Sequence, residues 1–124
     1  MSQHQEDYLK IMYEFGDSQK LIANKYIAEK LKIAPASVTE MINKLAEEGL
    51  VEYVPYQGSR LSTKGRTIAT NLYQSHELWE YFLVTHLDYQ KEQAHVLAEE
   101  LEHVSPQDLL RRLDSFLKKI ENKE

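Results

Sequence analysis

The sequence predicts a mainly α-helical protein with one small β-hairpin near its middle. Apolar residues recur at helical spacing through most of the 124 residues, and an alternating pattern replaces that spacing only between residues 50 and 62. The chain has no cysteine and no apolar run that could form a signal peptide or cross a membrane. We therefore expect a cytoplasmic protein without disulfides and without a membrane partner.

Three helices separated by short turns are predicted in the first 50 residues. The first covers residues 5–15 and is stopped by Gly16-Asp17-Ser18. The second covers residues 25–31 and takes Asn24 as its N-cap. The third covers residues 35–48 and begins with a proline, which suits the first turn of a helix.

The alternating pattern that follows Gly49 predicts two short strands, at residues 50–54 and 60–62, joined by a turn at residues 55–58. The order helix, helix, turn, helix and hairpin is that of a winged helix-turn-helix, whose turn between helices is only a few residues long. Residues 1–70 are therefore predicted to form a winged helix-turn-helix DNA-binding domain.

Further helices are predicted to form a helical metal-binding and dimerisation domain over residues 71–124. A long helix with Thr63 as its N-cap leads into this domain. Asp88 is predicted to cap a helix over residues 89–104, and Ser105-Pro106 opens the last helix. One continuous helix would then connect the two domains.

The net charge of −5 belongs entirely to the second half of the chain. Residues 1–75 carry nine acidic and nine basic side chains, whereas residues 76–124 carry eleven acidic and six basic ones. Residues 53–75 hold three basic side chains and no acidic one. A neutral first half with a local basic strip can still meet DNA phosphates, so the overall acidity does not exclude DNA binding.

The helix predicted over residues 89–104 carries a face of metal-ligating residue types. At about 100° per residue, four side chains fall on one side of this helix, opposite its apolar side. These are His95, Glu99, Glu102 and His103. His76 and Glu80 form a second pair, one helical turn apart. Imidazoles and carboxylates suit a divalent first-row metal ion, but a solvated helix also has a polar face. Spacing alone leaves both interpretations open.

Enzymatic interpretations fit the sequence less well. The pairs Glu92/His95 and Glu100/His103 match the Glu-x-x-His pattern of di-iron carboxylate enzymes, which place their two motifs on different helices. Here both pairs fall on one helix. There is no His-Glu-x-x-His, no Gly-x-Ser-x-Gly and no phosphate-binding glycine loop. We therefore expect neither an enzyme nor a small-molecule substrate.

In a winged helix-turn-helix, the start of the third helix enters the major groove, and the hairpin can reach the backbone or the minor groove. Hydroxyl and amide side chains at these places can contact phosphates and base edges. The second helix can anchor phosphates from its N-terminal end. The candidate DNA-binding residues are Lys25, Tyr26, Pro35, Ala36, Ser37, Thr39, Glu40, Asn43, Tyr56, Gln57 and Arg60.

Four runs of the sequence carry a family resemblance: EDYLKIMYE, APASVTEMINKLAEEGLVEYVPYQGSRLSTKG, HELWEYFL and HVLAEELEHV. They resemble the diphtheria toxin repressor family of iron- or manganese-dependent transcriptional regulators, in particular its manganese-responsive branch. The match covers about residues 6–117. The resemblance implies a homodimer that represses metal-uptake genes by binding a palindromic operator in double-stranded DNA when metal is bound.

The resemblance also implies two metal sites. The primary site would use Asp7, Glu99, Glu102 and His103, and the ancillary site His76, Glu80 and His95. Iron-type members place a cysteine and a methionine where this chain has Glu99 and Asp7, and carboxylates in place of sulfur favour a harder ion. Mn²⁺ is therefore the expected ion, with Fe²⁺ as the alternative and with Zn²⁺ or Co²⁺ able to bind in vitro.

Two features depart from the family pattern. Lys10 stands where short manganese regulators carry a ligand glutamate, and a protonated lysine cannot bind a cation, so the number of metals per subunit stays open. The chain also ends before the SH3-like domain of long members, as a naturally short form or as a truncated one. The alternative function is a winged-helix protein-interaction or metal-buffering module that does not read DNA.

Overall fold

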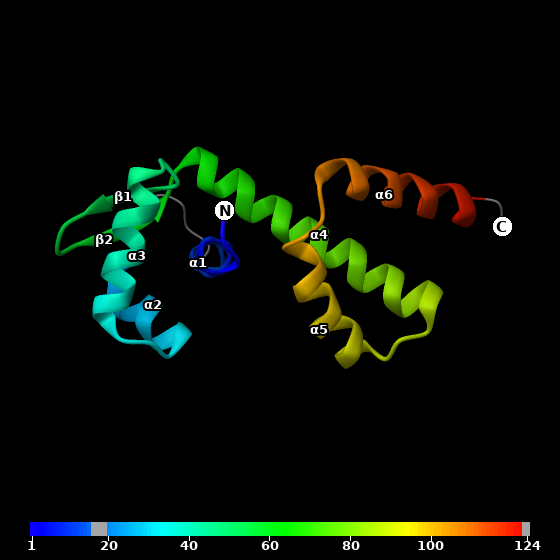
Figure 1. The fold of residues 1–124 in the computed structure, drawn as a ribbon, viewed down its shortest axis with the longest axis horizontal. Coiled ribbons are helices and arrows are strands. Elements are labelled where there is room, and N and C mark those ends of the chain that lie inside the picture. Colours follow the sequence, from blue (N-terminus) through cyan, green and yellow to red (C-terminus); the bar gives the residue numbers. More distant parts are fainter. Residues whose placement is uncertain (16–19, 123–124) are drawn as a thin grey trace. The chain divides into compact units, whose positions relative to one another are not determined.

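The computed structural model describes residues 1–15 and 20–122, in which six helices and one two-stranded antiparallel sheet are present (Figure 1). This confirms the predicted fold class of a mainly α-helical chain with a small hairpin. The chain divides into two compact units, Met1–Thr70 (unit 1) and Asn71–Glu124 (unit 2). The predicted helix stop at Gly16-Asp17-Ser18 lies outside the described residues.

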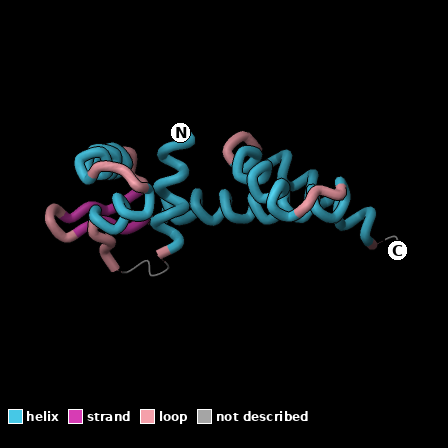
Figure 2. The backbone as a smooth tube through the Cα atoms, turned by 90° about the horizontal axis from the view of Figure 1, so that it is seen from below, coloured by secondary structure: helices cyan, strands magenta, loops and turns pink. Residues whose placement is uncertain are grey.

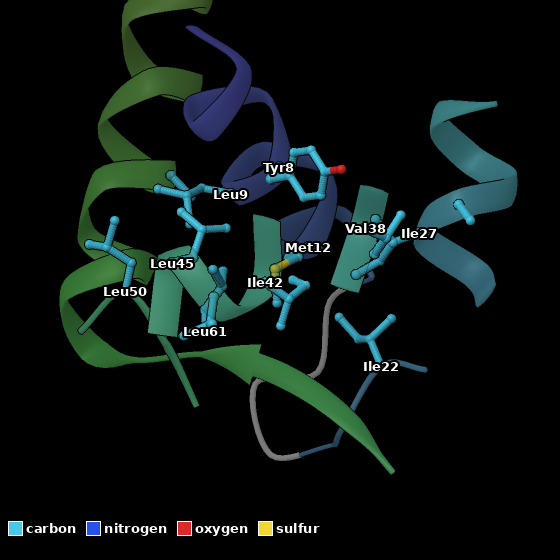
Figure 3. Close-up of a cluster of buried hydrophobic side chains, with 13 residues drawn as sticks. Tyr8, Leu9, Met12, Ile22, Ile27, Val38, Ile42, Leu45, Leu50 and Leu61 are labelled. Carbon is cyan, nitrogen blue, oxygen red and sulfur yellow. The ribbon is translucent and has the colours of Figure 1, made fainter. Parts of the chain in front are cut away.

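Unit 1 is a winged helix-turn-helix built around one apolar core. Its elements are α1 (Gln3–Glu14), α2 (Asn24–Leu31), α3 (Pro35–Glu47), β1 (Val51–Val54), β2 (Gly58–Leu61) and the first residues of α4 (Thr63–Leu87). Figure 3 shows Leu9 and Met12 of α1 in the same apolar cluster as Ile42 and Leu45 of α3. Because both helices contribute side chains to this core, the core holds the third helix in place within unit 1.

The hairpin of unit 1 is held by a third backbone segment. β1 pairs with β2 so that Val51 faces Leu61 and Val54 faces Gly58. Ile22 forms an isolated antiparallel bridge with Ser59, with N–H···O distances of 2.7 and 2.9 Å. Gly58 has a φ of +129°, and a Cβ at this position would lie 2.2 Å from the carbonyl oxygen of Ile22. Glycine is therefore required where these segments meet.

The ends of the helices follow the predictions in part. Gly49 adopts a φ of +76° after α3, and the Leu50 N–H donates to the Leu45 carbonyl at 2.9 Å, as a C-terminal glycine motif requires. The prediction of Asn24 as the N-cap of α2 was wrong. The N-cap is Ala23, without a side-chain hydrogen bond. The Asn24 amide instead donates to the hydroxyl of Thr39 in α3 at 3.1 Å, which ties the two helices together.

Unit 2 consists of the remainder of α4, α5 (Lys91–Glu102) and α6 (Gln107–Glu121), joined by short loops (Figure 2). Buried aliphatic residues such as Leu72, Leu83, Leu110 and Leu117 form its interior. A hydrogen bond ties α4 to the loop between α5 and α6, since the Trp79 indole N–H donates to the Ser105 hydroxyl at 2.8 Å. No helix among the described residues is both long enough and apolar enough to span a bilayer.

Two predicted caps of these helices were also wrong. The N–H of Gly65 donates to the side chain of Ser62 at 3.1 Å, so Ser62 rather than Thr63 caps α4. Asp88 does not cap α5, which begins at Lys91 with Gln90 as its N-cap. Asp88 has a φ of 60° directly after α4 and so turns the chain toward α5. The cap of α4 is thus one residue earlier than predicted, and the cap of α5 is two residues later.

Candidate metal centre and nucleic-acid interface

Unit 2 brings three metal-ligating side chains together where α4 meets α5. His76 and Glu80 lie one turn apart on α4, and His95 lies on α5. Nε2 of His76 is 2.8 Å from Oε2 of Glu80 and 3.2 Å from Nδ1 of His95. One ligand atom from each residue lies within 4.8 Å of the other two, and the structure offers no other such group of three among its described residues. A divalent ion with bonds of about 2.1 Å could contact all three after a small adjustment.

Both histidines of this cluster also contact a carboxylate through their other ring nitrogen. Nδ1 of His76 lies 2.8 Å from Oε1 of Glu102, and Nε2 of His95 lies 3.1 Å from Oε1 of Glu99. A neutral imidazole that donates one N–H to a carboxylate leaves a lone pair on its other nitrogen. In this tautomer of His76 and His95, two lone pairs and a carboxylate oxygen of Glu80 would face one another, an arrangement that a cation stabilises. Carboxylates orient metal-binding histidines in this way.

The buried carboxylate of Glu102 contacts two imidazoles. Its side chain is 0% exposed, and Nε2 of His103, itself only 7% exposed, lies 3.9 Å from Oε2 of Glu102. On its other side is the 2.8 Å contact with His76. Burying an ionised carboxylate is costly unless a partner compensates for lost hydration. Glu102 therefore needs these histidines, or a metal ion, to be stable in its position.

Residues assigned to the two sites are in direct contact within unit 2. Glu102 of the predicted primary set touches His76 of the ancillary set, and Glu99 of the primary set touches His95 of the ancillary set. The His95–Glu99 contact follows from their i,i+4 spacing on a helix. The His76–Glu102 contact joins residues 26 positions apart and has no signal in the spacing.

Asp7, the remaining predicted ligand, belongs to α1 of unit 1. It is half-buried and lines a pocket of about 490 Å³ together with residues of α1 and α3, among them Ser37 and Glu40. Its assignment to the primary metal site stays a prediction.

The predicted DNA-reading residues of α3 differ in how exposed their side chains are. Pro35, Ala36, Ser37, Glu40 and Asn43 are exposed. Thr39 is half-buried, and its hydroxyl donates to the carbonyl of Pro35 at 3.2 Å while it accepts the Asn24 amide. The exposed residues are available for base or phosphate contacts, whereas the Thr39 hydroxyl is already used within the helix-turn-helix.

The candidate residues of α2 and the hairpin are mostly at the surface. Tyr56 is fully exposed at the hairpin tip, where its φ is 66°, and Gln57 beside it is exposed as well. In α2, Nζ of Lys25 lies 5.1 Å from the ring centroid of Tyr26, within reach of a cation–π contact. These positions suit phosphate contacts, and their role in DNA binding stays a prediction.

Arg60 has an acidic neighbour that the sequence interpretation did not include. Nε and Nη2 of Arg60 donate to Oε2 of Glu52 at 3.1 and 3.0 Å. The two residues are directly opposite in the register of β1 and β2. The predicted hairpin contained the signal for this contact, because opposite charges at paired positions of antiparallel strands attract.

The comparisons with known proteins cover both units. Residues 1–59 match the N-terminal DNA binding domain of the iron dependent repressor family, and residues 62–124 match the metal binding and dimerisation domain of the same family. An HTH-type transcriptional regulator of Methanocaldococcus jannaschii is 36% identical over 124 residues, which are 99% of each chain.

Two solved structures of longer proteins are also similar. The manganese regulator SloR is 43% identical with a TM-score of 0.75, and ScaR, solved with bound Zn²⁺, is 41% identical with a TM-score of 0.79. Each comparison covers 92% of this chain and 53% of the other, so the chain spans about half the length of these two relatives. Because both domains match and the Methanocaldococcus jannaschii relative is 36% identical over 99% of its length, this protein belongs to the iron-dependent repressor family, the diphtheria toxin repressor family that the sequence motifs indicated.

Proposed function

We propose that this protein is a Mn²⁺-dependent transcriptional repressor that binds a palindromic operator as a homodimer. The observation that carries the proposal is the convergence of His76 Nε2, His95 Nδ1 and Glu80 Oε2 in unit 2. Imidazole and carboxylate ligands, oriented by further carboxylates, are a donor set for a divalent ion. Unit 1 supplies the exposed start of α3 as the DNA-reading element.

The donor set fits Mn²⁺ but does not exclude its neighbours in the periodic table. The chain contains no cysteine, so thiolate ligands, which favour softer ions, are not available. One similar structure is a manganese regulator and another holds Zn²⁺. Affinity at nitrogen and oxygen sites rises from Mn²⁺ through Fe²⁺ and Co²⁺. We therefore propose Mn²⁺ as the physiological signal and expect tighter binding of Co²⁺ or Zn²⁺ in vitro.

The proposed ligands form two sets. His76, Glu80 and His95 would hold the ancillary ion, and Glu99, Glu102 and His103 would take part in the primary site together with Asp7. The proposal for Asp7 rests on the family resemblance alone. Because Asp7 belongs to the unit that contains α3, its ligation would couple metal binding to DNA reading. The metal can shift the DNA-binding equilibrium only by its preference for the competent state.

A metal-buffering or protein-interaction module that does not read DNA is the second candidate. The ion pair between Arg60 and Glu52 favours this candidate, because it neutralises the positive charge of the hairpin. The exposed residues at the start of α3 favour DNA reading instead. In a helix-turn-helix, the N-terminal end of this helix enters the major groove and contacts base edges.

The deciding experiment selects duplexes from a randomised pool with the full chain and Mn²⁺, and then measures their binding by fluorescence anisotropy at fixed salt. We expect selected duplexes to bind at least about tenfold more tightly with Mn²⁺ than with EDTA, as a coupling of a few kcal/mol provides. The His103→Ala variant should lose this response to Mn²⁺. The Ser37→Ala variant should bind the selected duplexes more weakly both with Mn²⁺ and with EDTA. Asp108→Asn, a surface change in unit 2, is the control.

The outcomes separate the candidates. Equal DNA affinity with Mn²⁺ and with EDTA would rule out a metal-dependent DNA-binding regulator. Metal binding by the chain without enrichment of any duplex would favour the buffering module. Circular dichroism of each variant establishes that the fold is intact.

A further inference from the structure

The hairpin of unit 1 contains only two charged side chains, and they are paired with each other. Within residues 50–62, Glu52 is the only acidic residue and Arg60 the only basic one. Glu52 stands opposite Arg60 in the strand register, and its Oε2 accepts from both Nε and Nη2 of Arg60 at 3.1 and 3.0 Å. The hairpin therefore has no net charge, although it belongs to the surface proposed to meet DNA phosphates.

The ion pair is strong enough to orient Arg60 and weak enough to be exchanged. Both side chains are partly exposed, at 37% for Arg60 and 57% for Glu52, so water screens their attraction. Exposed pairs of this kind contribute little to stability. A phosphate is a charge-assisted acceptor of the same guanidinium and can replace the carboxylate if it is placed beside it. A phosphate that approaches loosely meets a cation that is already neutralised.

We propose that Glu52 is a specificity-determining residue of the DNA interface, which acts by holding Arg60 across the hairpin. This inference rests on the proposed DNA-binding function and deepens it. In a complex with DNA of unrelated sequence, α3 has no fixed register, so no phosphate is held where it could replace Glu52. When α3 fits its operator, the hairpin is positioned and Arg60 changes partner. Glu52 thereby weakens sequence-independent binding more than operator binding.

The test compares Glu52→Gln with the unsubstituted chain on a duplex of unrelated sequence and on the selected operator, over a range of salt concentrations. Releasing Arg60 from Glu52 makes its guanidinium available for at most about one phosphate contact, which steepens the slope of log K against log salt by up to about 0.9. At about 0.1 M salt the affinity for the unrelated duplex should rise by up to roughly eightfold. Operator affinity should rise less, so the ratio of operator to unrelated affinity falls. Glu52→Asp keeps the charge and should retain most of the original slope.

Two further variants establish that the effect passes through Arg60. Adding Glu52→Gln to an Arg60→Gln chain should leave both the affinity and the slope unchanged. An equal gain in that background would show simple repulsion between Glu52 and DNA, and would overturn the inference. Asp108→Asn breaks a comparable exposed ion pair in unit 2 with the same change in net charge, and should not steepen the slope.

The remaining outcomes distinguish this inference from the function on which it rests. Metal-dependent operator binding with an unchanged slope in Glu52→Gln would overturn the inference and keep the function. An unsubstituted chain that binds no duplex at any salt concentration would overturn both.

Discussion

Nδ1 of His76 lies 2.8 Å from Oε1 of Glu102, so a predicted ancillary ligand is in contact with a predicted primary ligand. The contact is shielded from water, since the side chain of Glu102 is 0% exposed and that of His76 is 11% exposed. On its other edge, His76 faces Glu80. His76 therefore belongs to the metal cluster and is at the same time the nearest compensating partner of a buried carboxylate.

His76→Ala is expected to destabilise unit 2 even without metal. It removes the nearest partner of the buried Glu102 carboxylate, and breaking a buried pair on one side costs about 3 kcal/mol. Urea unfolding in EDTA measures the effect, followed by the fluorescence of Trp79, the single tryptophan of the chain. His95→Ala is the control, because its side chain is 54% exposed and its removal should cost less than about 1 kcal/mol. Equal losses in the two variants would contradict this account of Glu102.

Thr39→Val is expected to weaken the helix-turn-helix itself. The Thr39 hydroxyl accepts the Asn24 amide at 3.1 Å and donates to the Pro35 carbonyl at 3.2 Å. Losing the hydroxyl leaves the amide without this acceptor and should cost about 1 kcal/mol, measured by thermal unfolding. Thr39→Ser keeps the hydroxyl and should retain both stability and DNA affinity. A stable Thr39→Val chain that no longer binds DNA would instead make Thr39 a direct DNA contact.

The fold could be predicted because its signals are local. The helical period of apolar residues, the glycine after α3 and the change to alternation at the hairpin each depend on neighbours in the chain. The caps were harder to predict, because several polar residues compete at each helix start. Asn24 is a good N-cap by type, but its amide contacts Thr39 from the next helix. Ser62 takes the cap that was predicted for Thr63.

The candidate metal site could be predicted as a set of residue types but not as an arrangement. The contact of His95 with Glu99 follows from helical spacing, since the residues are one turn apart. The contacts of His76 with His95 and Glu102 depend on how α4 packs against α5. Packing is decided by buried side chains along both helices, and spacing within either helix does not contain that information.

Lys32→Gly is expected to stabilise unit 1. Lys32 ends α2 in the left-handed region, with φ 58° and ψ 47°, and the N–H of Ile33 closes the helix on the carbonyl of Ala28 at 3.1 Å. A non-glycine residue in this region is strained, so glycine should raise the free energy of unfolding by about 0.5–1 kcal/mol. Lys30→Gly, inside the same helix, should lower it by about 1 kcal/mol. Thermal unfolding followed by circular dichroism compares them, and losses in both would refute the strain at Lys32.

Tyr81→Phe is expected to raise the pKa of Glu121. The Tyr81 hydroxyl donates to the Glu121 carboxylate at 2.6 Å and His86 contacts it at 2.9 Å, and these contacts hold the pKa of Glu121 below its ordinary value. A carboxyl group with a lowered pKa stabilises the fold at pH values above its ordinary pKa. This contribution is lost as the pH falls through the lowered pKa. The same hydrogen bond raises the pKa of Tyr81, so its contribution is lost only in strong alkali. NMR titration of Glu121 should show its pKa returning toward 4.5 in Tyr81→Phe and remaining depressed in Tyr89→Phe. An unchanged titration in Tyr81→Phe would assign the shift to His86 instead.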